Sequence, residues 1–300
     1  MRHFWFVPDC LPIAPRPHGD ELISSWLRRV AAANWLSVGE LLDALRETDQ
    51  NLPILRNAEF CLPDPWRSRL ATLARLPTER IHALELRLRF PHVNPGWFTH
   101  HAVRGPAGSD RPLTLILPVC AECCARDDAP PLSRADSCFA FQTHCPRHLT
   151  PLVDHCGRCG HIGLPGHGFS CEQCQASLRP THCIPNSSGT EIIARLESDL
   201  LASLVHGRAP SRFWIGTMSA GAFVNLIAEL ITVVLLRSNI AGERHARHAL
   251  ADLLTPDEFD RRYNLSGGRF DRLHFPALPW FARFKVMAAL TQLLLGDRGQ

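Results

Sequence analysis

Between residues 117 and 174 the chain carries four motifs of the same spacing: Cys120-Ala-Glu-Cys123, Cys145-Pro-Arg-His148, Cys156-Gly-Arg-Cys159 and Cys171-Glu-Gln-Cys174. In each motif two residues separate two side chains that bind metal ions. This spacing allows two thiolates, or a thiolate and an imidazole, to converge on one tetrahedral ion from a tight turn. One such pair carries little information, but four in a single short segment strongly favour two structural zinc ions.

The motifs predict two sites for structural Zn²⁺, each with four protein ligands. The expected ligands are Cys120, Cys123, Cys145 and His148 for the first ion, and Cys156, Cys159, Cys171 and Cys174 for the second. Two alternatives stay open: the adjacent Cys124 could replace Cys123, and the pairs could interleave in a cross-brace. A catalytic zinc ion keeps one position open for water, whereas four protein ligands fill each of these sites. A deaminase site is excluded because no H-x-E motif precedes Cys120.

Helical patterns flank the cysteine-rich segment on both sides. The chain is therefore predicted to be mostly α, with a central zinc-binding module of the zinc ribbon or knuckle type, an N-terminal helix-turn-helix-like bundle and a C-terminal helical domain. The expected domains are residues 1–112 (arm and helix-turn-helix-like helices), 113–185 (double zinc finger) and 186–300 (C-terminal helices). Structural zinc contributes about 10 to 16 kcal/mol to the folding of small finger peptides, which offsets the small apolar core of such a module.

An arm and a first helix pair are predicted at the N-terminus. Four prolines lie within residues 4–19, which favours an extended arm because proline fixes φ and lacks a backbone donor. From Asp20 to Ala33 apolar side chains recur every fourth position, with Asn34 as the expected C-cap. Ser37-Val-Gly-Glu40 then predicts a capping box that starts the next helix.

A similar helix pair follows. One helix is expected around Trp66, Leu70, Leu73 and Ala74, and after Pro77-Thr78 another around Ile81, Leu84 and Leu88. The two pairs predict a compact four-helix unit across residues 20–90. Its arginines are interspersed with acidic residues, which favours a packing unit over one that contacts DNA.

The C-terminal third returns to helical patterns after a predicted loop. Residues 91–112 are rich in Pro, Gly and His and form the expected loop, where His100 and His101 lack the spacing of metal ligands. The predicted apolar stripes comprise Ile192, Ile193, Leu196, Leu200 and Leu204, ended by Gly207; then Phe223, Ile227, Leu230, Ile231 and Val234; and last Met287, Leu290 and Leu294. The stripes favour a helical core.

Two further features of the C-terminal third predict a helix start and a partner contact. Thr255-Pro-Asp-Glu258 predicts a capping box with proline at the first helical position. Trp280 and Phe284 are candidates for a contact in a homodimer or with a partner, because aromatic residues are enriched at such interfaces.

The charge balance excludes several functional classes. Residues 1–90 carry 12 Lys+Arg against 11 Asp+Glu, residues 91–185 carry 7 against 7, and residues 186–300 carry 13 against 11. A protein that holds DNA tightly by itself usually shows a concentrated basic surface, so modest or assisted nucleic-acid contact is expected. The single lysine, Lys285, is followed by Val286, which excludes a P-loop ATPase.

No membrane span or secretory signal is predicted. The N-terminus lacks an uninterrupted apolar stretch, and the most hydrophobic run, residues 213–236, contains Asn225 and Glu229. The chain is therefore expected to be soluble and cytoplasmic. In that reducing compartment CxxC pairs favour metal binding over disulfides.

Two parts of the chain together resemble the TniQ family of transposition proteins. The first is Leu11-Pro-Ile-Ala-Pro-Arg-Pro-His-Gly-Asp-Glu-Leu-Ile-Ser-Ser-Trp-Leu-Arg-Arg-Val-Ala-Ala-Ala-Asn34, with its proline-rich arm, Glu, Ser-Trp-Leu and Asn. The second is Cys120-x-x-Cys123, a Phe-rich segment, His144-Cys-Pro-Arg-His148, Leu152 and Cys156-x-x-Cys159. The resemblance covers roughly residues 8–185. The chain departs from the family's pattern at Ala121, where proline is common.

The resemblance implies a non-catalytic targeting adaptor rather than an enzyme. Members of this family link a transposon's AAA+ ATPase, of the TnsC/TniB type, to a target-recognition element. In CRISPR-associated members that element is an RNA-guided effector complex, and in longer TnsD-like relatives it is DNA that the protein reads itself.

Two other functions have requirements that the sequence meets less well than those of an adaptor. A self-sufficient zinc-containing, sequence-specific DNA-binding protein needs a helix in the major groove and side chains that read bases. A zinc-dependent nuclease or hydrolase needs an open metal position and a carboxylate base, for which only Glu122 and Asp154 lie beside the ligands.

Overall fold

The structure is a computed structural model of the whole chain. It describes residues 10–45, 59–99, 102–103, 114–115, 118–120, 122–123, 132–153, 156, 158–159, 171, 173–176, 188–211, 214, 216–239, 275–277 and 280–295. These residues are mostly helical, with two small antiparallel sheets of two strands each, which confirms the predicted fold class. No helix among them is long and apolar enough to cross a membrane.

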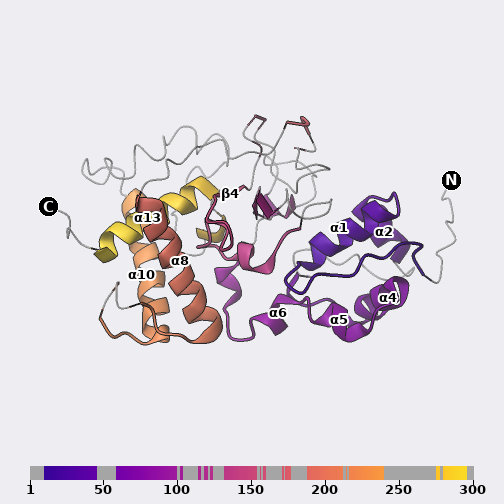
Figure 1. Cartoon of the computed structure of the whole chain (residues 1–300), viewed down its shortest axis with the longest axis horizontal. Helices are drawn as coiled ribbons and strands as arrows, with labels where there is room; N and C mark the ends of the chain where they lie inside the picture. Colours follow the sequence, from indigo (N-terminus) through magenta and orange to yellow (C-terminus); the bar gives the residue numbers. More distant parts are fainter. Residues whose placement is uncertain are drawn as a thin grey trace.

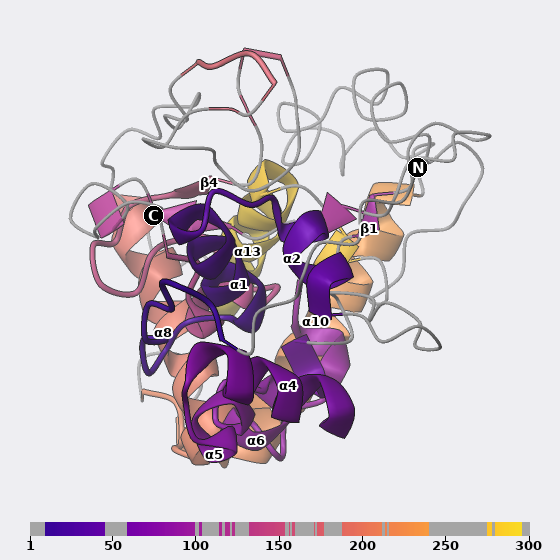
Figure 2. The same cartoon turned by 90° about the vertical axis from the view of Figure 1, so that its right-hand side faces the viewer.

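Helices gather at the two ends of the molecule (Figure 1). The N-terminal end contains α1 (Ile23–Ala33), α2 (Val38–Leu45), α4 (Asp64–Ala74), α5 (Thr78–His82) and α6 (Leu86–Arg89). The C-terminal end contains α8 (Ser188–His206), α10 (Ala220–Asn239) and α13 (Trp280–Leu295). Seen from the N-terminal end, the first set lies in front of the second (Figure 2).

Short elements connect the two ends. The strands are β1 (Ala102–Val103) paired with β2 (Thr114–Leu115), and β3 (Val119–Cys120) paired with β4 (Leu152–Val153). The 3-10 turns are η1 (Pro95–Trp97), η2 (Ala135–Cys138) and η3 (Phe275–Ala277). The stretch of residues 132–150, called here the central segment, runs between the N-terminal and C-terminal helices.

Helix α1 begins three residues later than the sequence predicts. Glu21 forms a β-bridge with Arg134, and the backbone N–H of Leu22 donates to Ser133 O at 3.0 Å, so these residues are extended rather than helical. The first N–H groups of α1 are satisfied by Glu59, whose carboxylate accepts from Ile23 N at 3.0 Å and Ser24 N at 2.9 Å. Glu59 thus caps the helix from a distant part of the chain.

The turn between α1 and α2 matches the prediction. Asn34 is the C-cap of α1, and the residue after it, Trp35, has a φ of 59°. The N–H of Leu36 donates to Ala31 O at 2.9 Å, which completes a Schellman motif. The capping box is confirmed: Ser37 N donates to Glu40 Oε2 at 2.8 Å, and Glu40 N donates to Ser37 Oγ at 3.2 Å.

The pair α4–α5 repeats the pair α1–α2 at an offset of 40 residues. In α4 the residue with positive φ is Arg75 (51°), and the N–H of Leu76 donates to Ala71 O at 2.9 Å, as in the first turn. Buried positions with this offset are Leu22 and Leu62, Trp26 and Trp66, Val30 and Leu70, Ala31 and Ala71, and Leu41 and Ile81. The chain therefore builds its N-terminal end from two copies of one hairpin.

The prediction of one continuous helix around Ile81, Leu84 and Leu88 is wrong, because the chain forms two short helices there, α5 and α6. At the break Glu85 is fully buried, and its carboxylate pairs with Arg67 at 2.7 Å. Leu88, predicted to be part of the apolar stripe, is 45% exposed. The chain turns here to bury the ion pair, a distant contact that the local apolar pattern does not encode.

Two apolar cores support the fold. The N-terminal core is formed by α1, α2, α4, α5 and Leu11 of the arm. The larger core joins α8, α10 and α13 to residues 86–98 and to the aromatic side chains of η2 and its neighbours, where the rings of Phe139 and Phe98 stack at 4.8 Å. This second core draws on all three predicted domains, whose boundaries at residues 112 and 185 stay predictions.

The predicted C-terminal stripes pack in the larger core, although Ile192, Leu204, Leu230 and Leu294 are only partly buried. The fully or nearly fully buried positions are Ile193, Leu196, Leu200, Phe223, Ile227, Ile231, Val234, Met287 and Leu290. Helix α8 ends at His206, directly before Gly207 with φ +62°, as predicted. The predicted capping box at Thr255 lies outside the described residues.

Candidate metal centre

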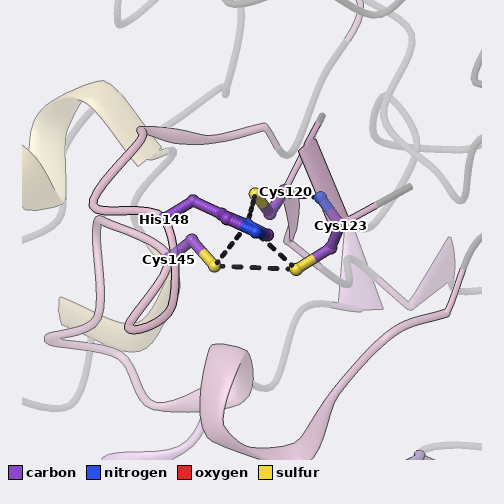
Figure 3. A group of neighbouring side chains, drawn as sticks. All are labelled: Cys120, Cys123, Cys145 and His148. Atoms are coloured by element: carbon purple, nitrogen blue, oxygen red, sulfur yellow. Dashed lines mark hydrogen bonds between the residues drawn. The ribbon is translucent and has the colours of Figure 1, made fainter. Parts of the chain in front are cut away.

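The hairpin of β3 and β4 positions the first two motifs. Val119 pairs with Val153 and Cys120 with Leu152 in antiparallel register. This pairing brings Cys120 and Cys123 next to the turn that carries Cys145 and His148 (Figure 3). These four residues are called the first metal group.

The ligand atoms of the first metal group have the spacing of a tetrahedron. Cys123 Sγ lies 3.7 Å from Cys145 Sγ, and His148 Nδ1 lies 3.4 Å from both Cys120 Sγ and Cys123 Sγ and 3.7 Å from Cys145 Sγ. Bonds of about 2.3 Å to sulfur and about 2.0 to 2.1 Å to nitrogen in a tetrahedral zinc site place neighbouring ligand atoms about 3.5 to 3.8 Å apart. The four side chains therefore surround a position that could hold such an ion.

The second metal group consists of Cys156, Cys159, Cys171 and Cys174. Cys156 Sγ lies 3.6 Å from Cys174 Sγ, and Cys159 Sγ lies 3.6 Å from Cys171 Sγ. All four sulfur atoms lie within 4.8 Å of one another. Among the described residues these two are the only groups of side chains gathered closely enough to hold a metal ion.

The structure brings the eight predicted residues together as two sequential sets of four. The first and second motifs form one group and the third and fourth form the other, so the pairs do not interleave in a cross-brace. Cys123 is part of the first group, while Cys124, His100 and His101 lie outside the described residues. That the groups bind zinc stays a prediction.

The motifs that start at Cys145 and Cys171 are each followed by the same type of backbone turn. At Cys145, Leu149 N donates to Cys145 O and Cys145 N donates to Thr150 O, both at 2.8 Å. At Cys171, Gln175 N donates to Cys171 O at 2.9 Å and Cys171 N donates to Ala176 O at 2.8 Å. The fifth residue of each turn has a positive φ, 55° at Leu149 and 58° at Gln175, where glycine is the usual choice.

The donor set and its electrostatics fit zinc. Seven sulfur atoms and one imidazole nitrogen make up the two groups, with no carboxylate, and soft sulfur donors select zinc over magnesium or calcium. A hydrogen bond with Cys145 lowers the pKa of the Cys120 thiol to about 4, while burial and the Cys120 charge raise the pKa of Cys123. Three thiols and one imidazole so close together favour the binding of a divalent cation, because the cation stabilises every thiolate at once.

The second group has a thiolate held by backbone groups. Burial opposes ionisation of Cys156, but the N–H groups of Cys159 and Arg158 outweigh it and lower its pKa to about 7. Similar N–H contacts reach sulfur elsewhere: Cys123 N lies 3.4 Å from Cys120 Sγ, and Gln173 N lies 3.4 Å from Cys171 Sγ. Such bonds are available only when the motif closes into a tight turn.

Strand β4 connects the two groups through its alternating faces. Leu152 packs with the cysteines of the first metal group, together with Phe284 of α13. Val153 packs with Cys156 and Cys171 of the second. Phe284, a candidate for a partner contact, is thus used inside the molecule, where its ring also meets His144 at 5.6 Å.

Helix α8 holds the residues that precede Cys145. Glu197 is fully buried and accepts hydrogen bonds from Gln142 Nε2, Thr143 N and His144 N, each at 3.1 Å. The hydroxyl of Thr143 also donates to Glu197. A buried carboxylate is stabilised by such donors, so α8 and the central segment are fixed to each other.

Helix α13 holds the same segment from another side. Arg283 is fully buried, and its Nη1 donates to Ala140 O at 2.8 Å and to Gln142 O at 3.3 Å. The first metal group is therefore anchored to the C-terminal helices by one carboxylate and one guanidinium.

Asp20 connects the first metal group to the N-terminal helices. Its carboxylate accepts from Arg134 at 2.7 Å and from Arg147 at 2.5 Å, and Arg147 lies within the Cys145–His148 motif. Partial burial opposes the effect, but the hydrogen bond with Arg134 and the charges of both arginines lower the pKa of Asp20. Ala135 N also donates to Asp20 O at 2.9 Å.

The remaining motif residues of the N-terminal stretch hold the arm. Trp26 Nε1 donates to Pro15 O at 2.8 Å. Asn34 Nδ2 donates to Ile13 O at 2.5 Å, and Ile13 N donates back to Asn34 Oδ1 at 3.1 Å. Glu21 is fully buried and pairs with Arg29 at 2.7 Å. The polar side chains of this stretch thus serve internal contacts.

Sequence reasoning did not find Glu59, Glu197 or Arg283. Each meets its partner across a long sequence separation, 35 residues for Glu59 with Ser24 and 54 for Glu197 with Thr143. The one available signal is that Glu197 occupies the fourth position after Ile193 in an apolar helix, where a charged residue is unusual.

The chain matches a known protein family over part of its length. Residues 12–152 match the family model TniQ, a range that begins in the arm and ends at β4. It includes the whole first metal group and ends before Cys156 of the second. No curated protein matches the chain significantly.

Proposed function

Because residues 12–152 belong to the TniQ family, we propose that the protein is a non-catalytic adaptor in transposition that links an AAA+ ATPase of the TnsC/TniB type to a target-recognition element. One observation carries the proposal. The polar residues of the family-like stretches, from Asp20 to Asn34 and from Thr143 to His148, are used to join the arm, the helices and the metal groups into one body. Such a molecule offers shaped surfaces to partners rather than a reactive centre.

We propose that two Zn²⁺ ions complete this body. Cys120, Cys123, Cys145 and His148 would hold one ion, and Cys156, Cys159, Cys171 and Cys174 the other. With four protein donors each, neither ion keeps a position for water, so zinc here supplies folding energy and not catalysis. The thiols must stay reduced for this role, which supports the cytoplasm as the protein's location.

The N-terminal helices favour the adaptor over a self-sufficient DNA-binding protein. In a helix-turn-helix motif the second helix enters the major groove, where basic or amide side chains meet phosphates and bases. The second helix of the first hairpin, α2, exposes the carboxylates of Glu40 and Asp43. In the second hairpin this helix, α5, has only five residues. Both features disfavour reading DNA without help, so we assign target choice to the partner, either a CRISPR RNA-guided complex or a DNA-bound protein.

Pull-down and gel-shift experiments with the full-length, zinc-loaded protein test the proposal. We expect a gene for an AAA+ ATPase beside the gene of this protein. The protein should form a complex with that ATPase and should shift DNA only weakly at physiological salt. Tight DNA binding by the protein alone, with a steep dependence on salt, would contradict the adaptor and favour a self-sufficient DNA-binding protein. Hydrolysis of nucleic acid that is lost with the zinc ions would contradict both.

A further inference from the structure

An exposed tryptophan marks the turn between α1 and α2. Trp35 is 96% exposed, the highest value among the large apolar residues described as exposed. It also has a φ of 59°, in the left-handed region that a tryptophan rarely adopts. In a Schellman motif this position usually carries glycine, which has no Cβ to strain the backbone. Neither burial nor backbone geometry therefore explains a tryptophan here.

The second hairpin supplies an internal comparison. Arg75 occupies the position that corresponds to Trp35, with a φ of 51° and the same pattern of backbone hydrogen bonds. Arg75 is exposed, as expected of a polar residue, and its Nη2 lies 2.7 Å from Cys10 Sγ. The same turn forms with arginine, so the fold does not require an aromatic side chain at this position.

The arm places a second apolar side chain beside the turn. Ile13 is 56% exposed, and its backbone is held by two hydrogen bonds with the side chain of Asn34, the residue before Trp35. Both side chains are therefore presented on fixed backbone, and the helices α1 and α2 that this turn joins lie at the end of the molecule remote from α8, α10 and α13 (Figure 1). Rigid aromatic and aliphatic side chains of this kind act as anchors in protein interfaces.

The charge beside the anchor indicates the kind of partner. Helix α2 begins three residues after Trp35 and exposes the carboxylates of Glu40 and Asp43. Carboxylates repel nucleic-acid phosphates and attract basic side chains, so the surface suits a protein. We propose that Trp35 and Ile13 anchor a protein–protein contact, and that the partner offers an apolar pocket with lysine or arginine side chains at its rim.

The experiment uses the AAA+ ATPase as the binding probe and in this respect rests on the proposed function. Calorimetric titrations at physiological salt compare the wild-type protein with Trp35→Gly and with the matched control Arg75→Gly, all loaded with zinc. Trp35→Gly should weaken binding at least tenfold. Its melting temperature should stay the same or rise by about 1 to 3 °C, because glycine relieves the left-handed backbone. Arg75→Gly should leave the affinity within about twofold.

The outcomes separate this inference from the adaptor role. If the ATPase binds wild type and Trp35→Gly equally, the anchor is refuted and the adaptor stands. If it does not bind wild type, both are refuted. A lower melting temperature for Trp35→Gly would assign Trp35 a structural role and overturn the anchor. The anchor would also be overturned if Trp35→Gly lost DNA binding but kept its affinity for the ATPase, because the partner of Trp35 would then be a nucleic acid.

Discussion

Among the described residues, the first metal group packs against α13 as well as β4, whereas the second packs against Val153 of β4 and Ala176. Cys120, Cys123 and Cys145 are buried, and the group contacts Phe284 of α13. In the second group Cys159 is exposed, and the described apolar neighbours are Val153 and Ala176. Equal ligand geometry therefore does not mean an equal structural role. We expect a metal ion in the first group to stabilise the contact between both helical ends, and one in the second group to stabilise mainly the residues that carry its ligands.

Removing one ligand from each group gives the largest expected difference. Cys145→Ser should abolish the cooperative unfolding transition, because the energy of a structural zinc ion, about 10 to 16 kcal/mol, equals or exceeds the stability of a typical protein. Cys171→Ser should lose its ion but keep a cooperative transition of the helices. Circular dichroism during heating, with zinc measured by mass spectrometry, checks both: wild type should hold two ions and Cys171→Ser one. Equal behaviour of the two variants would refute the contrast.

Features of the fold and of the metal groups could be predicted from the sequence where the interacting residues lie close together along the chain. The metal motifs, the Ser37–Glu40 capping box and the Asn34 C-cap are set within three or four residues, and the structure has each residue where the sequence places it. The start of α1 and the break before α6 depend on Glu59 and on Glu85 with Arg67, partners 18 to 36 residues apart. No local pattern encodes which buried carboxylate meets which donor.

Local sequence patterns were also insufficient to predict how the metal motifs pair. Spacing alone suggested the eight residues but left sequential and interleaved pairing open. The ligand positions in the structure decide between them, since the first two motifs form one group and the last two form the other, while the β3–β4 register pairs Cys120 with Leu152. A two-residue strand carries too little sequence pattern to be paired in advance.

Glu197 tests whether the first metal group depends on α8. Glu197→Gln replaces one of the two buried carboxylate oxygens, which together accept from four donors of the central segment, by an amide N–H₂, so the free energy of unfolding should fall by about 2 to 4 kcal/mol. Urea denaturation measures the change. Glu191→Gln, an exposed position on the same helix, should change the stability by less than about 0.5 kcal/mol. If both variants are equally stable, the junction with α8 is weaker than its contacts indicate.

As pH rises, the contribution of the metal groups to stability should increase, whereas the contribution of Glu59 at the start of α1 should decrease. Zinc binding requires deprotonated thiols, so the metal-dependent part strengthens as pH rises. Burial raises the pKa of Glu59 from 4.5 to about 7, against the opposing hydrogen bonds from Ser24 and Ile23. Its contribution is complete below pH 4.5 and is lost as pH rises through about 7.

Glu59→Gln isolates that contribution, because glutamine cannot ionise. The stability of wild type relative to Glu59→Gln should fall by up to about 3 kcal/mol between pH 5 and pH 8. Urea denaturation at both pH values measures it, and the metal-dependent part cancels in the difference. The exposed Glu79→Gln should show no such trend. A relative stability that rises with pH would mean that Glu59 is ionised in the folded protein at pH 5.

The smallest expected effect comes from glycine substitutions in the two equivalent turns, at Leu149 and at Gln175. Leu149 and Gln175 both have a positive φ, and Leu149 is 55% exposed, so little packing is lost when either becomes glycine. Leu149→Gly should raise the free energy of unfolding by about 1 kcal/mol, because its turn belongs to the group that joins the helical ends. Gln175→Gly relieves the same strain but should raise only the zinc affinity of the second group, without moving the melting temperature. Heating curves and competition with a zinc chelator distinguish the two results. A lower melting temperature for Leu149→Gly would mean that the Leu149 side chain contributes packing beyond its exposed surface.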